Sequence, residues 1–167
     1  MGTRTDFLGR SWAVERVGCA IADGSMGLPG GLVAKTAHFV LHQDPDIPLP
    51  GFLVLGSKRH VQSMASFSEA EFREFVDLLR IGHRAIKDHA GVQHLTVVQE
   101  EYSTHFHLWF FPWTDEVMAK YGDPSLGEIR RIMRGFRTAD PIQDSDWHRL
   151  LETIEQIRVD VSAALEL

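Results

Sequence analysis

The segment that most constrains this chain is residues 105–112, which reads His-Phe-His-Leu-Trp-Phe-Phe-Pro. Side chains two positions apart on a β-strand point to the same face of the sheet. One face of the expected strand therefore carries His105, His107 and Trp109, and the opposite face carries apolar residues. An apolar row can seal the strand against a core while the imidazoles face a cleft. Paired imidazoles suit proton transfer, nucleophilic attack on phosphorus or metal binding.

The composition restricts the classes of protein that this segment can belong to. The chain has 167 residues, of which 44% are hydrophobic and 24% charged, and this fits one globular domain. A net charge of −6 argues against a nucleic-acid partner, although local donors can still bind a phosphorylated small molecule. Cys19 is the single cysteine, so we expect no internal disulfide and a cytoplasmic location. We expect neither a membrane span nor a secretory signal, because the apolar runs are too short.

The hydrophobic pattern predicts an α+β fold with an antiparallel sheet. Strand patterns occupy residues 32–42, 51–57, 94–99 and 105–113. The clearest helix is expected at 68–90, where Ser68 and Glu71 form a capping box ahead of an apolar stripe with helical spacing. Further helices are expected near 125–136 and 145–165. A short helix or turn is expected at residues 11–22.

Upstream segments extend the motif into a pattern that resembles the histidine triad (HIT) superfamily of nucleotide hydrolases and transferases. The family signature has three histidines alternating with apolar residues, and His105 and His107 match the first two. Residues 50–61 are similar to the family's Pro-Gly-His-x-Leu-Val-x-Pro-Lys-Arg-His segment. Residues 18–24 are similar to its Phe-Cys-x-Ile-x-x-Gly segment. The resemblance covers about residues 17–113.

This resemblance implies the architecture and the partners of the chain. Together with the helical patterns it predicts one HIT-like domain over residues 1–167, with a core at about 17–113 that the resemblance covers and a C-terminal helical extension at 114–167 that it does not explain. The implied fold is an antiparallel β-sheet with one long packed helix and additional C-terminal helices. A homodimer is implied, as is a nucleotide or nucleotidylated small molecule as ligand. Dinucleoside polyphosphates and nucleoside phosphoramidates are the usual substrates of the family.

The same resemblance implies roles for individual residues. His107 matches the family nucleophile, which attacks the α-phosphorus of a nucleotide, and His105 matches the histidine that orients it. Asp44 stands where the family has an aspartate that holds the ribose. Gln99 and Ser103 are candidate phosphate contacts by position. For each of these residues a purely structural role remains the alternative.

Departures from the family pattern bear on the chemistry. Trp109 replaces the third histidine, and an indole offers one donor but no titratable proton, so it either contacts the ligand or only packs. Phe52 replaces the histidine after the glycine, and Ser57 stands in place of a proline. Arg16, not cysteine, lies three residues before Cys19, so we expect the zinc site of some members to be absent and no cofactor to be needed.

Three functions remain open at this stage. The leading one is a nucleotide hydrolase or nucleotidyl transferase that acts at the α-phosphorus through His107. The second is a nucleotide-binding protein that has lost turnover with the third histidine. The third, ranked lowest, is a metal enzyme that uses His105 and His107 as ligands. A separate hypothesis is that one arginine of residues 130–137 reaches the site and binds a distal phosphate.

Overall fold

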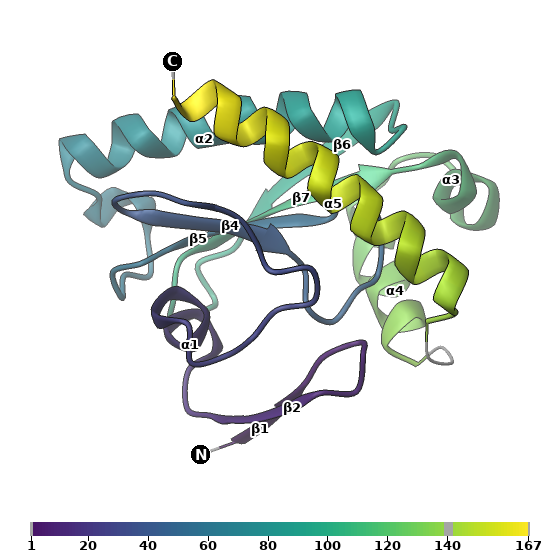
Figure 1. The fold of residues 1–167 in the computed structure, drawn as a ribbon, viewed down its shortest axis with the longest axis horizontal. Helices are drawn as coiled ribbons and strands as arrows, with labels where there is room; N and C mark the ends of the chain where they lie inside the picture. Colours follow the sequence, from purple (N-terminus) through teal and green to yellow (C-terminus); the bar gives the residue numbers. More distant parts are fainter. Residues whose placement is uncertain (1, 139–141, 167) are drawn as a thin grey trace.

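The computed structural model describes residues 2–138 and 142–166, and over these it contains a five-stranded sheet, a two-stranded hairpin and five α-helices (Figure 1). The hairpin consists of β1 (Gly2–Thr5) and β2 (Ser11–Val14). The sheet consists of β3 (Leu32–Lys35), β4 (Phe39–Gln43), β5 (Leu53–Ser57), β6 (His94–Gln99) and β7 (His107–Trp113). The helices are α1 (Val17–Asp23), α2 (Glu69–His89), α3 (Asp115–Tyr121), α4 (Leu126–Arg137) and α5 (Asp144–Leu165). The predicted α+β class is therefore confirmed.

The sheet has the strand order β3-β4-β5-β7-β6, and every neighbouring pair is antiparallel. Leu41 pairs with Leu55, and Leu55 pairs with Leu108, so the three leucines form one row across β4, β5 and β7. All three are buried in the main hydrophobic core. Burying such a side chain contributes about 1.5–3 kcal/mol, so this row is a strong determinant of the register.

Helices α2 and α5 cover this apolar face of the sheet and lie side by side in Figure 1. Ser68 caps α2 through the expected capping box with Glu71, which satisfies two backbone N–H groups at the start of the helix. The buried stripe of α5 is Leu150, Ile154, Ile157 and Val161, at the spacing of one helix face. The helices predicted at 68–90, 125–136 and 145–165 are thus confirmed within a few residues.

A second hydrophobic cluster lies at the other end of the sheet. It joins the segment after β4 to the end of β7 and to helices α3 and α4, and its buried members are Ile47, Leu49, Phe52, Phe111, Trp113, Val117, Ile129, Ile132 and Met133. Phe52, the residue in place of the family histidine, is fully buried here against Phe111. This cluster fixes the C-terminal end of α4 near the sheet.

Some predicted boundaries are wrong, for local reasons. Residues 11–14 form β2, because they pair with the N-terminal strand in the register Gly2↔Val14, and only α1 within residues 11–22 is helical. The strand pattern at 32–42 is split into β3 and β4 by a turn, in which the hydroxyl of Thr36 accepts a hydrogen bond from the backbone N–H of Phe39. His105 precedes β7 instead of beginning it. Helix α3 carries no long apolar stripe and was not expected.

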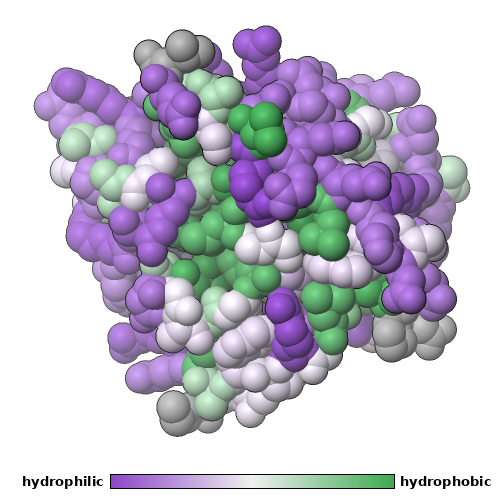
Figure 2. Space-filling view, in the orientation of Figure 1, coloured by the Kyte–Doolittle hydropathy of each residue, from purple (hydrophilic) through white to green (hydrophobic). Residues whose placement is uncertain are grey.

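Among the described helices, none combines the length and the apolar character that crossing a membrane requires. In the view of Figure 2, a hydrophobic area near the middle of the molecule is surrounded by hydrophilic side chains.

Candidate active site

A cavity of about 250 Å³ lies against the face of the sheet that α2 and α5 leave uncovered. The residues of the sheet that line it are Val40, His42, Val54, Gly56, His107 and Trp109. These positions alternate with the leucine row, so the same strands carry core on one face and cavity on the other. Helix α1 and the segments around Arg4, Asp44, Ser103 and Arg137 complete the walls.

The strand register sets two rows of side chains along the floor of the cavity. His107 lies opposite Gly56, which lies opposite Val40. In the next row, Trp109 lies opposite Val54, which lies opposite His42. Because Gly56 has no side chain, the strand between β4 and β7 leaves open space beside His107.

His107 presents a defined tautomer to this space. Its Nδ1 is 3.1 Å from the carbonyl oxygen of His105. A carbonyl oxygen only accepts, so Nδ1 is the donor in this contact, and in the neutral tautomer that it selects the lone pair is on Nε2. A neutral imidazole held in this way is the form that nucleophilic attack requires.

His105 is held more tightly than His107. Its Nε2 donates to the carbonyl oxygen of Ser57 at 2.7 Å, and burial lowers the pKa of the imidazole. Helix α1 packs directly on the ring, because a Cβ at Gly18 would lie only 2.7 Å from His105 Cγ. Ser103 Oγ fixes the backbone here by donating to the carbonyl of His105 at 2.9 Å.

His105 belongs to a cluster of three potential metal donors, together with Cys19 and His60. Cys19 Sγ lies 3.4 Å from Nδ1 of both His60 and His105, and the two Nδ1 atoms are 3.3 Å apart. Tetrahedral zinc with Zn–S near 2.3 Å and Zn–N near 2.0–2.1 Å places its ligand atoms about 3.3–3.6 Å apart. Arg16 removes one donor of the family pattern, as the sequence indicates, but the remaining three fit a zinc ion. His107 is not part of this cluster.

Asp44 lies in the cavity wall just after β4 and is only 6% exposed. Its Oδ1 accepts hydrogen bonds from the backbone N–H groups of Asp46 and Ile47, at 2.8 and 3.0 Å. Burial, reinforced by the charge of Asp46, raises the pKa of the Asp44 carboxyl to about 7. The group therefore changes charge near neutral pH.

The remaining predicted residues are placed differently. Trp109 lines the cavity, with its ring 5.5 Å from that of His107 and edge-on against Phe52. Gln99 lies opposite Leu108 in the sheet, so it belongs to the face that the helices cover and does not line the cavity. The structure thus gathers His105, His107, Asp44, Ser103 and Trp109 at one site and leaves Gln99 outside it.

Comparison of the whole structure with solved structures gives a consistent set of neighbours. A HIT-like protein from Bartonella henselae, described as involved in cell-cycle regulation, matches with a TM-score of 0.59 and 12% identity, over 89% of this chain and 98% of its own. A hypothetical histidine triad nucleotide-binding protein from Sulfolobus tokodaii matches with a TM-score of 0.57 and 16% identity, over 87% and 91%. A zinc-bound histidine triad family protein from Mycobacterium smegmatis matches with a TM-score of 0.58 and 15% identity, over 85% and 94%.

The chain has the histidine triad fold. The fold that the sequence resemblance implies is thereby confirmed. No family model and no curated protein matches the sequence itself. The similarity is therefore one of architecture, and the chemistry has to be argued from the residues of this chain.

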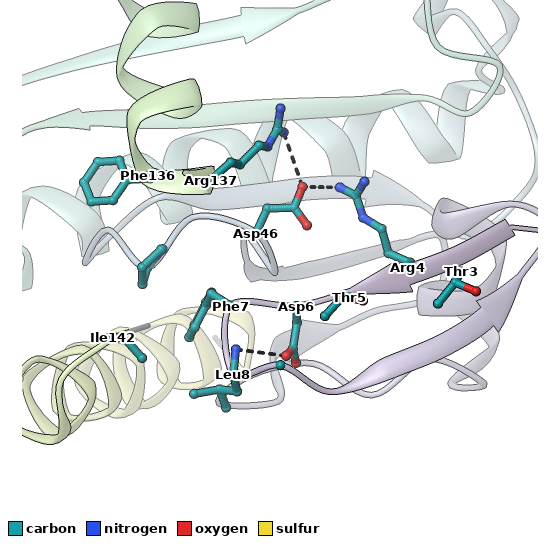
Figure 3. A pocket seen from close by; sticks show the side chains of 12 residues that line it. Thr3, Arg4, Thr5, Asp6, Phe7, Leu8, Asp46, Phe136, Arg137 and Ile142 are labelled. Carbon is teal, nitrogen blue, oxygen red and sulfur yellow. Dashed lines mark hydrogen bonds and ion pairs between the residues drawn. The ribbon is translucent and has the colours of Figure 1, made fainter. Parts of the chain in front are cut away.

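One wall of the cavity is formed by an ion-paired group that the sequence analysis did not assemble. Arg4 of β1 and Arg137 at the end of α4 both pair with the buried carboxylate of Asp46, Arg137 at 3.3 Å (Figure 3). The three residues line both the inner cavity and an outer groove of about 770 Å³. The Arg4–Asp46–Arg137 group thus separates the two. The hypothesis that an arginine of 130–137 reaches the site fits the position of Arg137.

A further cavity residue that the sequence analysis missed is His42. It is 3% exposed, and it lies in β4 two residues before Asp44. The alternation of β4 alone would place it on the same face as Val40, but only the register shows that this face is the floor of the cavity.

Proposed function

We propose that this protein binds a nucleotide and cleaves it, or transfers its nucleotidyl group, at the α-phosphorus. The observation that carries the proposal is His107, which lines the cavity and whose Nδ1 donates to a backbone carbonyl, while within residues 2–138 and 142–166 no group hydrogen-bonds to its Nε2. The name of the Sulfolobus tokodaii neighbour, a nucleotide-binding protein, supports a nucleotide as ligand.

In the proposed reaction, His107 Nε2 attacks the α-phosphorus and forms a P–N bond while the bond to the leaving group breaks. The resulting imidazolium keeps its proton on Nδ1, which donates to the carbonyl oxygen of His105, so the developing positive charge faces a fixed dipole. Water or another acceptor then attacks the same phosphorus and forms a new bond to it, the P–N bond breaks and returns the neutral imidazole of His107, and the proton of the attacking group passes to solvent. The nucleotidyl group passes first to His107 and then to the acceptor, so the nucleophile is regenerated.

The nature of the leaving group follows from Trp109. An indole cannot supply a proton to the atom that departs. A phosphate or polyphosphate leaves as an anion without being protonated first, whereas an amine does not. We therefore infer that phosphoanhydrides, such as dinucleoside polyphosphates, are better substrates than nucleoside phosphoramidates.

Two charged groups complete the proposed ligand site. Asp44 would accept hydrogen bonds from the ribose hydroxyls. Arg137 and Arg4 lie in the wall of the cavity, and their donors can bind the phosphates beyond the α-position. Asp46 holds both guanidinium groups in place and leaves a net charge of +1 in the Arg4–Asp46–Arg137 group.

The test is to assay His107→Ala and His107→Gly on adenylylated substrates that include diadenosine polyphosphates and adenosine phosphoramidate. Loss of the nucleophile is expected to lower turnover by about 10³-fold or more. His94→Ala, in β6, is the matched control and should retain activity. Turnover near that of the unmodified protein in either His107 variant removes His107 as the nucleophile.

A second candidate function is nucleotide binding without turnover, and the observation that favours it is Trp109 at the third position. Calorimetry that shows tight binding, with no product after long incubation, supports it. Turnover that disappears in the His107 variants eliminates it. The metal-enzyme hypothesis based on His105 and His107 gains no support, because Nδ1 of His107 faces a carbonyl instead of the donor cluster.

We further propose that Cys19, His60 and His105 hold zinc, as the cluster geometry and the zinc-bound Mycobacterium smegmatis neighbour support. The ion would fix Nδ1 of His105, and thereby the carbonyl that orients His107. Zinc bound in this way supplies positive charge and rigidity to the site.

We also propose a homodimer, because β6 is an edge strand of the sheet and its Val97 is 41% exposed. Sedimentation equilibrium tests this proposal, and a monomer at micromolar concentration contradicts it.

A further inference from the structure

His42 is a polar side chain in an otherwise apolar part of the cavity. Its neighbours on the cavity walls are Val40 on its own strand, Val54 on β5 and Ile21 on α1. A buried polar group among apolar ones is costly unless each of its polar atoms finds a partner. The contacts of the two ring nitrogens therefore decide what His42 can do.

The hydrogen bonds of His42 fix its tautomer. Its Nδ1 lies 2.8 Å from the carbonyl oxygen of Gln43. The carbonyl only accepts, so Nδ1 is the protonated nitrogen and Nε2 carries a lone pair. Within residues 2–138 and 142–166, no side chain or backbone group donates to Nε2. His42 thus offers the cavity one hydrogen-bond acceptor and no donor.

The charge state of His42 agrees with this role. Burial, with a smaller contribution from the nearby His107, lowers its pKa to about 4. At neutral pH the imidazole is uncharged, so it is poorly suited to act as the general acid that Trp109 cannot be. What His42 can do at neutral pH is accept a hydrogen bond at Nε2, in an orientation that the Nδ1 contact fixes.

The position of His42 relative to His107 corresponds to the length of a nucleotide. Strands β4 and β7 are separated only by β5, and neighbouring strands lie about 4.8 Å apart, so the two histidines stand on strands about 10 Å apart. Gly56 and Val54 lie between them. A ligand whose phosphorus is at His107 can therefore cross the floor at Gly56 and bring a flat apolar group against Val40, Val54 and His42.

We propose that His42 is a specificity-determining residue that accepts a hydrogen bond from an exocyclic amino group of the nucleotide base. The inference rests on the proposed function and deepens it by naming the chemistry of the base that the site selects. A base with an amino group at this position satisfies Nε2, whereas a base without one leaves a buried acceptor unpaired. The difference corresponds to about tenfold in affinity.

The experiment measures dissociation constants by calorimetry for two pairs of ligands that differ only in an amino group. The pairs are AMP with purine riboside 5′-monophosphate and GMP with IMP. The unmodified protein is expected to prefer the amino member of one pair about tenfold. His42→Phe keeps an aromatic ring but removes the acceptor, and it should reduce this preference to about twofold or less. His94→Phe, the same substitution at an exposed histidine outside the cavity, should keep the preference.

Folding of the variants is checked by circular dichroism, and His42→Met serves as a second variant without the acceptor nitrogen. A preference that persists in both His42 variants overturns the inference, as does the lack of any preference in the unmodified protein, while the proposed function stands. Failure of the unmodified protein to bind any of the four nucleotides overturns the proposed function and the inference together.

Discussion

The two faces of the central sheet are built from the same strands, but one face packs into the core and the other lines the cavity. Leu41, Leu55 and Leu108 form a closed apolar row under α2 and α5. The sequence neighbours of these leucines point to the opposite face, where His42, Gly56 and His107 form the floor of a cavity. Because the period of a strand is two, a shift of one residue separates the stabilising row from the chemical one. Substitutions on the first face should change stability, and those on the second should change binding or turnover.

The largest expected effect tests this separation directly. Phe110 is fully buried on the helix-covered face of β7, so Phe110→Ala should lower the free energy of unfolding by about 3–5 kcal/mol. His107→Ala, on the other face of the same strand, should lower it by less than about 1 kcal/mol. Urea denaturation followed by fluorescence measures both. Equal losses in the two variants contradict the division between the faces.

The next effect concerns the proposed zinc on the cavity side. Protein purified without added metal is expected to contain one zinc per chain, measured by elemental analysis. Cys19→Ser replaces the thiolate ligand, and it should weaken zinc binding by about 100-fold or more in competition with a chromogenic chelator. His83→Ala, in α2, is the control and should leave zinc content unchanged. An unmodified protein without stoichiometric zinc removes the metal site.

The pH dependence of binding sharpens the role of Asp44. Its carboxyl has a pKa raised to about 7, so it ionises between pH 6 and pH 8, and in the proposed complex the ionised group would accept from both ribose hydroxyls. Affinity for adenosine, which does not titrate in this range, should rise up to about tenfold from pH 6 to pH 8. In Asp44→Asn the affinity should be independent of pH. The same rise in Asp44→Asn would assign the effect to another group.

The raised pKa of Asp44 also predicts the sign of its effect on stability. The native state keeps the proton that the unfolded chain has already released, so the free energy of unfolding should fall as the pH rises from about 4 to about 7. Asp44→Asn should reduce this slope in urea denaturation across that range.

The smallest expected effect concerns Arg137, which is half exposed and partly neutralised by Asp46. Arg137→Gln should weaken binding of ADP by about three- to fivefold while leaving AMP nearly unchanged. Arg134→Gln, on the same helix but outside the cavity, is the matched control. Equal weakening of AMP and ADP by Arg137→Gln places the contact elsewhere than on the distal phosphate.

Much of the fold and part of the site could be predicted from the sequence, because the patterns are local. The capping box and the stripe of α2 are contained within one helix, and His105 and His107 are neighbours on one segment. The role of Gln99 could not be judged, because its face depends on its register against Leu108. The same holds for His42, whose partners in the row are on other strands.

Arg4 and Arg137 could not be assigned together to the cavity wall from the sequence for a different reason. Strand β1 has four residues and carries no apolar alternation, so nothing in it indicates pairing. Arg4 and Arg137 meet only because the hairpin and α4 both return to Asp46. Such a contact depends on the whole topology and has no local signature.

The Arg4–Asp46–Arg137 group has a consequence for how a ligand enters. One carboxylate ties together two chain segments that lie on either side of the histidine motif in sequence, and both guanidinium groups face the inner cavity and the outer groove. An anion that competes with Asp46 for these guanidinium groups loosens the tie as it arrives. Binding of an anionic ligand at this wall is therefore coupled to the ion pairs that hold the hairpin and α4 to Asp46.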